Sequence, residues 1–139
     1  PFQIGKAQML NEGADVTIIA TGHMVWEAIV AGEVLEKLGI DAEIINIHTI
    51  KPLDKEAILT SLAKTNCLVT VEEHQVAGGL GESIASLLAQ NQPYPMEMIG
   101  VNDEWGQSGT PVQLLEKYGL NAENIIKAAQ KVLKRKKKL

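Results

Sequence analysis

The stretch that decides the fold reads Asp15-Val16-Thr17-Ile18-Ile19-Ala20-Thr21-Gly22, an apolar run that ends in a turn. A helical pattern follows directly, because apolar residues recur at helical spacing between His23 and Leu38, and Gly39 supplies a C-terminal cap. A continuous Val/Ile run joined to a helix is typical of a parallel strand that is buried on both faces. The stretch therefore predicts a strand–helix unit of an α/β fold.

The same alternation continues on both sides of this unit. Toward the C-terminus, further strands are predicted at 42–48, 67–72 and 95–101, and further helices at 54–64, 81–90, 110–118 and 121–133. Toward the N-terminus, Lys6–Leu10 is expected to add a short strand at the edge of the sheet. The pattern predicts a single domain over residues 1–139, a three-layer α/β/α fold with a mostly parallel sheet of four or five strands.

The charge distribution limits the classes of partner. Six of the thirteen basic residues lie between 131 and 138, so the first 130 residues hold seven basic against seventeen acidic side chains. An acidic body argues against nucleic acid as a partner, and no apolar run is long enough to span a membrane. The basic tail, 134–139, is expected to be disordered or a frayed, solvated helix end.

The single cysteine bears on the cellular compartment. Cys67 lies in the apolar run Cys67-Leu68-Val69-Thr70-Val71, where a buried strand thiol is expected. One cysteine excludes an internal disulfide, and this is consistent with a reducing cytoplasm. The sequence therefore predicts a cytoplasmic protein whose thiol has no catalytic role.

Polar side chains gather where the predicted strands end. The three histidines, His23, His48 and His74, each follow a strand, and His74 comes directly after Glu72-Glu73. Ligands of open parallel sheets bind beyond the carboxyl ends of the strands, where neighbouring strands are only about 4.8 Å apart. Three interpretations are compatible with this set: a metal site, acid–base catalysis by His74 with Glu72 or Glu73, and a docking edge for another domain or subunit.

We expect the docking edge. The ligand spacings of metal sites are missing, and nothing marks a nucleophile or an oxyanion hole. The two tryptophans fit this interpretation, since Trp26 is expected to be a core or interface anchor and Trp105 an interface or lid contact in a glycine-rich loop. The residues expected at the edge are His23, His48, Glu73, His74 and Trp105.

A glycine-rich segment, Gly78-Gly79-Leu80-Gly81-Glu82-Ser83, is similar to a phosphate-binding loop but matches neither known pattern. The dinucleotide pattern needs a last glycine where Ile84 stands, and a P-loop needs Gly-Lys-Ser or Gly-Lys-Thr. Glu82, in the first turn of the predicted helix, would also repel a phosphate. We expect these glycines to allow a sharp turn and a close approach of the helix to the sheet.

Six segments identify a resemblance. In chain order they are Ile4-Gly5-Lys6, Gly13-Ala14-Asp15-Val16-Thr17-Ile18, His48-Thr49-Ile50-Lys51-Pro52-Leu53-Asp54, Val71-Glu72-Glu73-His74, Gly78-Gly79-Leu80-Gly81 and Gly106-Gln107-Ser108-Gly109. Over Phe2–Leu133 the chain resembles the C-terminal domain of transketolases, most of all the prokaryotic kind that is split into two shorter chains. The resemblance implies a mixed five-stranded sheet in which the first short strand, Lys6–Leu10, is antiparallel to the rest.

The resemblance also implies a reaction and its partners. Transketolases transfer a two-carbon ketol unit between sugar phosphates, as in the pentose phosphate pathway, with thiamine diphosphate and magnesium or calcium. The family's diphosphate-binding Gly-Asp-Gly motif and its pyrimidine-activating glutamate belong to other domains, and this chain has no Gly-Asp-Gly. The resemblance thus implies a chain without catalytic, cofactor-binding or metal-binding residues, inactive alone, that packs on the diphosphate-binding and pyrimidine-binding domains and contributes to a homodimer.

Two alternatives stay open. Deoxyxylulose-phosphate synthases and the beta subunits of 2-oxo-acid dehydrogenases have similar C-terminal domains, with segments like Lys51-Pro52-Leu53-Asp54, whereas Glu72-Glu73-His74 and Asn102-Asp103-Glu104-Trp105-Gly106 are more similar to transketolase. The other alternative, from a different class, is a regulatory module that binds a small molecule at the polar sheet edge.

Overall fold

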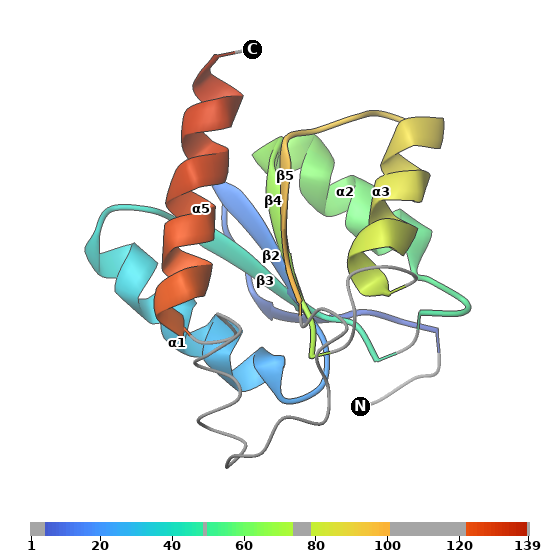
Figure 1. Cartoon of the computed structure of the whole chain (residues 1–139), viewed down its shortest axis with the longest axis horizontal. Coiled ribbons are helices and arrows are strands. Elements are labelled where there is room, and N and C mark those ends of the chain that lie inside the picture. Colours follow the sequence, from blue (N-terminus) through green and yellow to red (C-terminus); the bar gives the residue numbers. More distant parts are fainter. Residues whose placement is uncertain (1–4, 49, 74–78, 101–121, 139) are drawn as a thin grey trace.

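The computed structural model describes residues 5–48, 50–73, 79–100 and 122–138, which form one sheet between two layers of helices (Figure 1). Helices α1 and α5 pack on one face of the sheet, and α2 and α3 pack on the other. The elements are, in chain order, β1 (Gln8–Asn11), β2 (Val16–Ala20), α1 (Met24–Lys37), β3 (Ala42–Asn46), α2 (Lys55–Thr65), β4 (Leu68–Val71), α3 (Leu80–Gln90), β5 (Met96–Ile99) and α5 (Ala122–Lys137).

The strands lie in the order β1-β3-β2-β4-β5. β1 pairs antiparallel with β3, and the other neighbours pair in parallel. Every residue of β2 and β4 is buried, as the helical layers on both faces require. The predicted three-layer α/β/α fold is therefore confirmed, and so is the antiparallel first strand that the resemblance implied.

Local signals begin and end two helices where the sequence predicted. The Asp54 carboxylate accepts a hydrogen bond from the Ala57 N–H at 3.3 Å and caps α2. Gly39 follows α1 with a φ of +81°, a left-handed conformation that glycine adopts without a steric cost. The predicted helix at 110–118 lies outside the described residues.

The C-terminal tail differs from its prediction. The sequence predicted disorder or fraying over 134–139, but α5 continues to Lys137. The Arg135 Nη1 donates a hydrogen bond to the Met96 carbonyl at 2.7 Å, and the Lys136 ammonium donates to the carbonyls of Asp15 and Thr65 at 2.8 and 3.0 Å. The prediction is wrong for residues 134–137, because two of their charges bind the sheet and α2.

Candidate functional site

The residues that follow β2, β3 and β4 form the polar edge that the sequence predicted, which we call the carboxyl edge (residues 21–23, 46–48 and 72–73). The structure brings His23 and Glu73 together there: the His23 backbone N–H donates to the Glu73 carboxylate at 2.8 Å, and the His23 Nδ1 lies 3.4 Å from the same oxygen. The His48 Nε2 lies 3.3 Å from the Asn46 amide nitrogen, at the end of β3. His74 and Trp105 lie outside the described residues.

The geometry of His23 and Glu73 favours a structural contact over acid–base chemistry. The backbone contact is the shorter of the two, and the His23 side chain is 88% exposed. An imidazole in water lacks the enclosed setting by which active sites tune acids and bases. Since His23 is the N-terminal cap residue of α1, the Glu73 carboxylate compensates the positive end of that helix.

Glu72 does the same for α3, on the opposite face of the sheet. Its carboxylate is 1% exposed and accepts two hydrogen bonds, from the N–H groups of Leu80 and Gly81, both at 2.8 Å. Successive side chains of an extended chain point to opposite faces, so neighbouring glutamates reach helices in different layers. The sequence had proposed Glu72 as a possible partner of His74 in acid–base chemistry. The structure commits its carboxylate to the start of α3.

All four described helices begin next to a carboxylate of the chain itself. Glu73 compensates α1, Asp54 caps α2 and Glu72 caps α3, while Glu27 of α1 accepts a hydrogen bond from the Ala122 N–H, the first residue of α5, at 2.9 Å. Helix N-termini are ready-made sites for phosphates because their N–H groups and dipole favour negative charge. A diphosphate approaching the described helix N-termini would meet a carboxylate at each, so these residues do not fit a phosphate-bearing cofactor.

The glycine-rich segment serves packing, as the sequence predicted. A Cβ built on Gly81 would lie 2.6 Å from the Met98 Sδ and 3.1 Å from the Thr70 Oγ1. Both distances are shorter than ordinary van der Waals contacts, so a side chain there would push α3 away from β4 and β5. Glycine at position 81 is therefore required by the close approach of the helix to the sheet.

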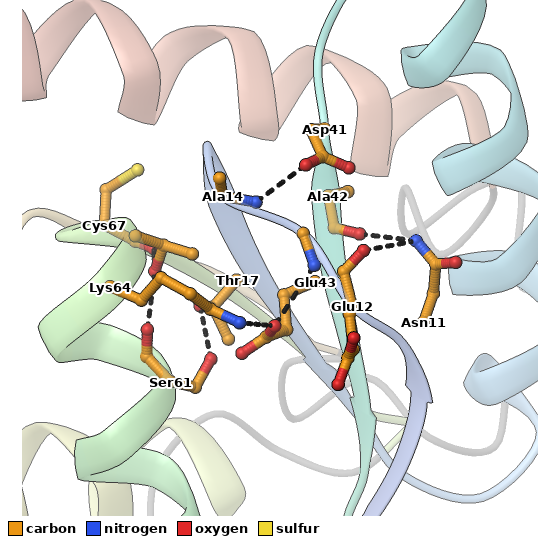
Figure 2. A network of polar contacts seen from close by, with 12 residues as sticks. Asn11, Glu12, Ala14, Thr17, Asp41, Ala42, Glu43, Ser61, Lys64 and Cys67 are labelled. Atoms are coloured by element: carbon orange, nitrogen blue, oxygen red, sulfur yellow. Dashed lines mark hydrogen bonds and ion pairs between the residues drawn. The ribbon is translucent and has the colours of Figure 1, made fainter.

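A second polar cluster lies at the opposite end of the strands (Figure 2). The buried Glu43 carboxylate of β3 accepts hydrogen bonds from the Lys64 ammonium of α2 and from the Gly13 N–H, the latter at 3.1 Å. Nearby, the Thr17 hydroxyl of β2 contacts the hydroxyls of Ser61 and Thr65 at 2.8 and 2.6 Å. Sequence reasoning missed this cluster, although Glu43, a charged residue inside an apolar strand, was a visible signal.

The charge of Glu43 is stabilised where it lies. Burial raises its pKa, but hydrogen bonds from Lys64, Ser61 and the Gly13 N–H, together with the positive charge of Lys64, lower it more, so the pKa lies below its ordinary value of 4.5. The pKa of Lys64 is raised, chiefly by its hydrogen bond to Glu43. The pair is thus an ion pair at neutral pH, and it ties α2 to β3.

The remaining chemical candidates carry no site. Among the described residues, no three His, Cys, Asp or Glu side chains are placed to hold a metal ion together. Cys67 is buried, and burial raises the pKa of its thiol, which confirms the expected inert strand thiol. No helix in the described part of the chain is long and apolar enough to cross a membrane.

Known proteins of the same architecture agree with this distribution. A solved chain described as a split gene transketolase, inactive beta4 tetramer, superimposes with a TM-score of 0.93 at 44% identity, over 97% of this chain and 44% of that one. A 6-deoxy-6-sulfo-D-fructose transketolase subunit of Clostridium sp. (strain MSTE9) is 50% identical over 135 residues, 97% of this chain and 42% of the relative. The chain thus spans less than half the length of these relatives.

Two further relatives widen the range of named activities. One of the two subunits of an apulose-4-phosphate transketolase of Phocaeicola vulgatus is 40% identical over 96% of this chain and 43% of its own. A 1-deoxy-D-xylulose-5-phosphate synthase of Heliobacterium modesticaldum is 42% identical over 93% of this chain and 20% of its own. Residues 5–125 match the family described as "Transketolase, C-terminal domain". The resemblance seen in the sequence is thereby confirmed, and the chain belongs to the family of transketolase C-terminal domains.

Proposed function

We propose that this chain is the C-terminal part of a transketolase-type enzyme that transfers a two-carbon ketol unit between sugar phosphates, as in the pentose phosphate pathway. The observation that carries the proposal is the family match over residues 5–125, joined to a relative named as a transketolase subunit at 50% identity. The chain itself has a structural role and is inactive alone. Thiamine diphosphate and its magnesium or calcium ion are bound by the diphosphate-binding and pyrimidine-binding domains.

The carboxylates at the helix N-termini support this division of labour. Glu72 and Glu73 fill positions at which an α/β protein would otherwise hold a phosphate. This also disfavours the alternative of a regulatory module for anionic small molecules, because such a ligand would meet negative charge at the carboxyl edge. The edge suits a protein surface better than a phosphate.

We further propose that the carboxyl edge docks on the rest of the enzyme through His23, His48, Glu73, His74 and Trp105. The N-terminal end of the described chain supports this placement: Gly5 packs next to Pro52, and the Ala7 N–H donates to the Asp54 carboxylate at 2.7 Å. Anything upstream of Gly5 would therefore start beside this edge. Trp26, in the first turn of α1, is 69% exposed, as an interface anchor would be in the separated chain.

Self-association and location are part of the same proposal. A relative at 44% identity is described as a tetramer of one kind of chain, which supports assembly of this protein with its own copies. A single buried cysteine supports a cytoplasmic location.

Calorimetry tests the division of labour. Thiamine diphosphate with Mg²⁺ should give no binding heat with this chain, whereas adding the missing domains should restore ketol transfer from xylulose 5-phosphate to an aldose phosphate. Glu73→Gln combined with His23→Ala should weaken that reconstitution by roughly tenfold, while Glu33→Gln on the exposed face of α1 should not. Micromolar binding of the cofactor by the chain alone would contradict the proposal.

A deoxyxylulose-phosphate synthase is the second candidate, and the Heliobacterium relative at 42% identity favours it. The same reconstituted enzyme separates the two reactions. Transfer from xylulose 5-phosphate supports the transketolase, and consumption of pyruvate with glyceraldehyde 3-phosphate supports the synthase. A 2-oxo-acid dehydrogenase would consume a 2-oxo acid without a sugar phosphate acceptor.

A further inference from the structure

The two outer strands of the sheet differ in how their free edges are treated. At the β5 edge, the Arg135 guanidinium donates to the Met96 carbonyl at 2.7 Å and also contacts the Glu97 carboxylate. At the β1 edge, the described residues give the backbone of Gln8–Asn11 no hydrogen bond beyond its ladder with β3. An unpaired edge presents a row of N–H and C=O groups to which another strand can bond.

The side chains along β1 form a self-complementary row. Lys6, Met9 and Glu12 all line one open groove of about 770 Å³ between this edge and α2, so they lie on the same side of the strand. The register shift between Met9 and Asn11 is the kind of bulge that re-aims a side chain in this way. Met9 is 47% exposed, and it stands three positions after the base and three before the acid.

We propose that β1 pairs antiparallel with β1 of a second copy of this chain, around a twofold axis at Met9. In such a pair, residues at equal distance from the axis lie opposite each other on one face. Lys6 of each copy then faces the second copy's Glu12, and the two Met9 side chains meet at the centre. The row of one base, one apolar residue and one acid is thus complementary to itself when reversed, which makes a second copy the occupant that matches it.

This inference deepens the self-association proposed above and names the face that makes it. It joins two five-stranded sheets into one continuous sheet and leaves the carboxyl edge free for the other domains. The groove along α2 gives the incoming side chains room, since Thr60 and Ala63 of α2 line its far wall.

Charge exchange tests the pairing. In sedimentation experiments from about 1 µM to about 1 mM of the chain, wild type should dimerise. Lys6→Glu or Glu12→Lys alone should raise the dimer Kd by about tenfold, because each single reversal sets like charges against one another twice. The double variant Lys6→Glu/Glu12→Lys should return the Kd to near the wild-type value. Glu36→Lys, at the far end of α1, is the matched control and should leave the Kd unchanged.

Hydrogen exchange gives an independent readout. The amides of Gln8–Asn11 should exchange more slowly as the protein concentration rises, and those of Met96–Ile99 should not. A wild-type chain that stays monomeric over this range overturns the proposal, as does a double variant that dimerises no better than the single ones. Ketol transfer plays no part in these measurements, so a failure of the proposed function would be recognised separately.

Discussion

Two buried threonines in neighbouring strands show how much a single hydroxyl depends on its partners. The Thr17 hydroxyl of β2 contacts those of Ser61 and Thr65 at 2.8 and 2.6 Å. The Thr70 hydroxyl of β4 is as deeply buried, but it has no hydrogen-bond partner among the described residues. Both strands pack under α2 and α3, so the environments differ mainly in hydrogen bonding.

We expect the same substitution to act in opposite directions at these two positions. Thr17→Val should lower the free energy of unfolding by about 1–3 kcal/mol, because it leaves two buried hydroxyls without a shared partner. Thr70→Val should leave stability unchanged or raise it by up to about 1 kcal/mol, since it removes a buried hydroxyl that has no bond to lose. Urea denaturation of both variants checks this. A loss at Thr70 as large as that at Thr17 would contradict it.

At the scale of elements, helix ends account for most of the polar contacts that cross between layers. Carboxylates that follow β4 or lie in α1 compensate the N-termini of three helices. At the opposite end, Lys136 of α5 donates to Thr65, the last residue of α2, and to Asp15 before β2. A cation near the final carbonyls of a helix is favourable, so this contact ties two helices together across the sheet.

The anchoring of α5 predicts a difference between neighbouring lysines. Lys136→Met should lower the free energy of unfolding by about 1–2 kcal/mol, because two carbonyls lose their donor. Lys137→Met should change it by less than about 0.5 kcal/mol, since Lys137 is exposed and makes no hydrogen bond in the described structure. Thermal denaturation of the pair measures the difference, and equal effects would show that the tail acts by charge alone.

At the scale of the whole molecule, the Glu43 cluster makes the fold sensitive to acid. Gly13 precedes β2, Glu43 lies in β3 and Lys64 lies in α2, so one carboxylate joins three parts of the chain. A Cβ on Gly13 would lie 2.4 Å from the Ala42 backbone carbon, which shows how closely the segment before β2 approaches β3.

The pKa of Glu43 gives the direction of the acid effect. Because this pKa is lower in the folded chain than its ordinary value of 4.5, the stability it contributes is present above that value and is lost as the pH falls through the lower, folded one. Glu43→Gln should therefore lower the free energy of unfolding at pH 7 by about 1–3 kcal/mol and flatten its fall below about pH 4.5. Denaturation across pH 3–7 measures this, with Glu33→Gln as an exposed control. An unchanged slope below pH 4.5 would contradict it.

The residues that the sequence placed correctly carry their information locally. Asp54 and Gly39 act through backbone groups a few positions away, and the Val/Ile runs of β2 and β4 need only their own composition to be recognised as buried parallel strands. The antiparallel direction of β1 came from resemblance, because a short strand with an exposed pattern does not reveal its partner.

By itself, then, the sequence determined the alternation of strands and helices, the three layers, the family and the polar character of the carboxyl edge. Only the tertiary structure decided what the charges do. Glu73 meets His23 fifty positions away, Glu27 meets Ala122 ninety-five positions away, and Lys136 reaches Asp15 over one hundred and twenty-one. Local propensity and periodicity are short-range properties, whereas the partner of a buried charge depends on which distant segments the packed core brings together.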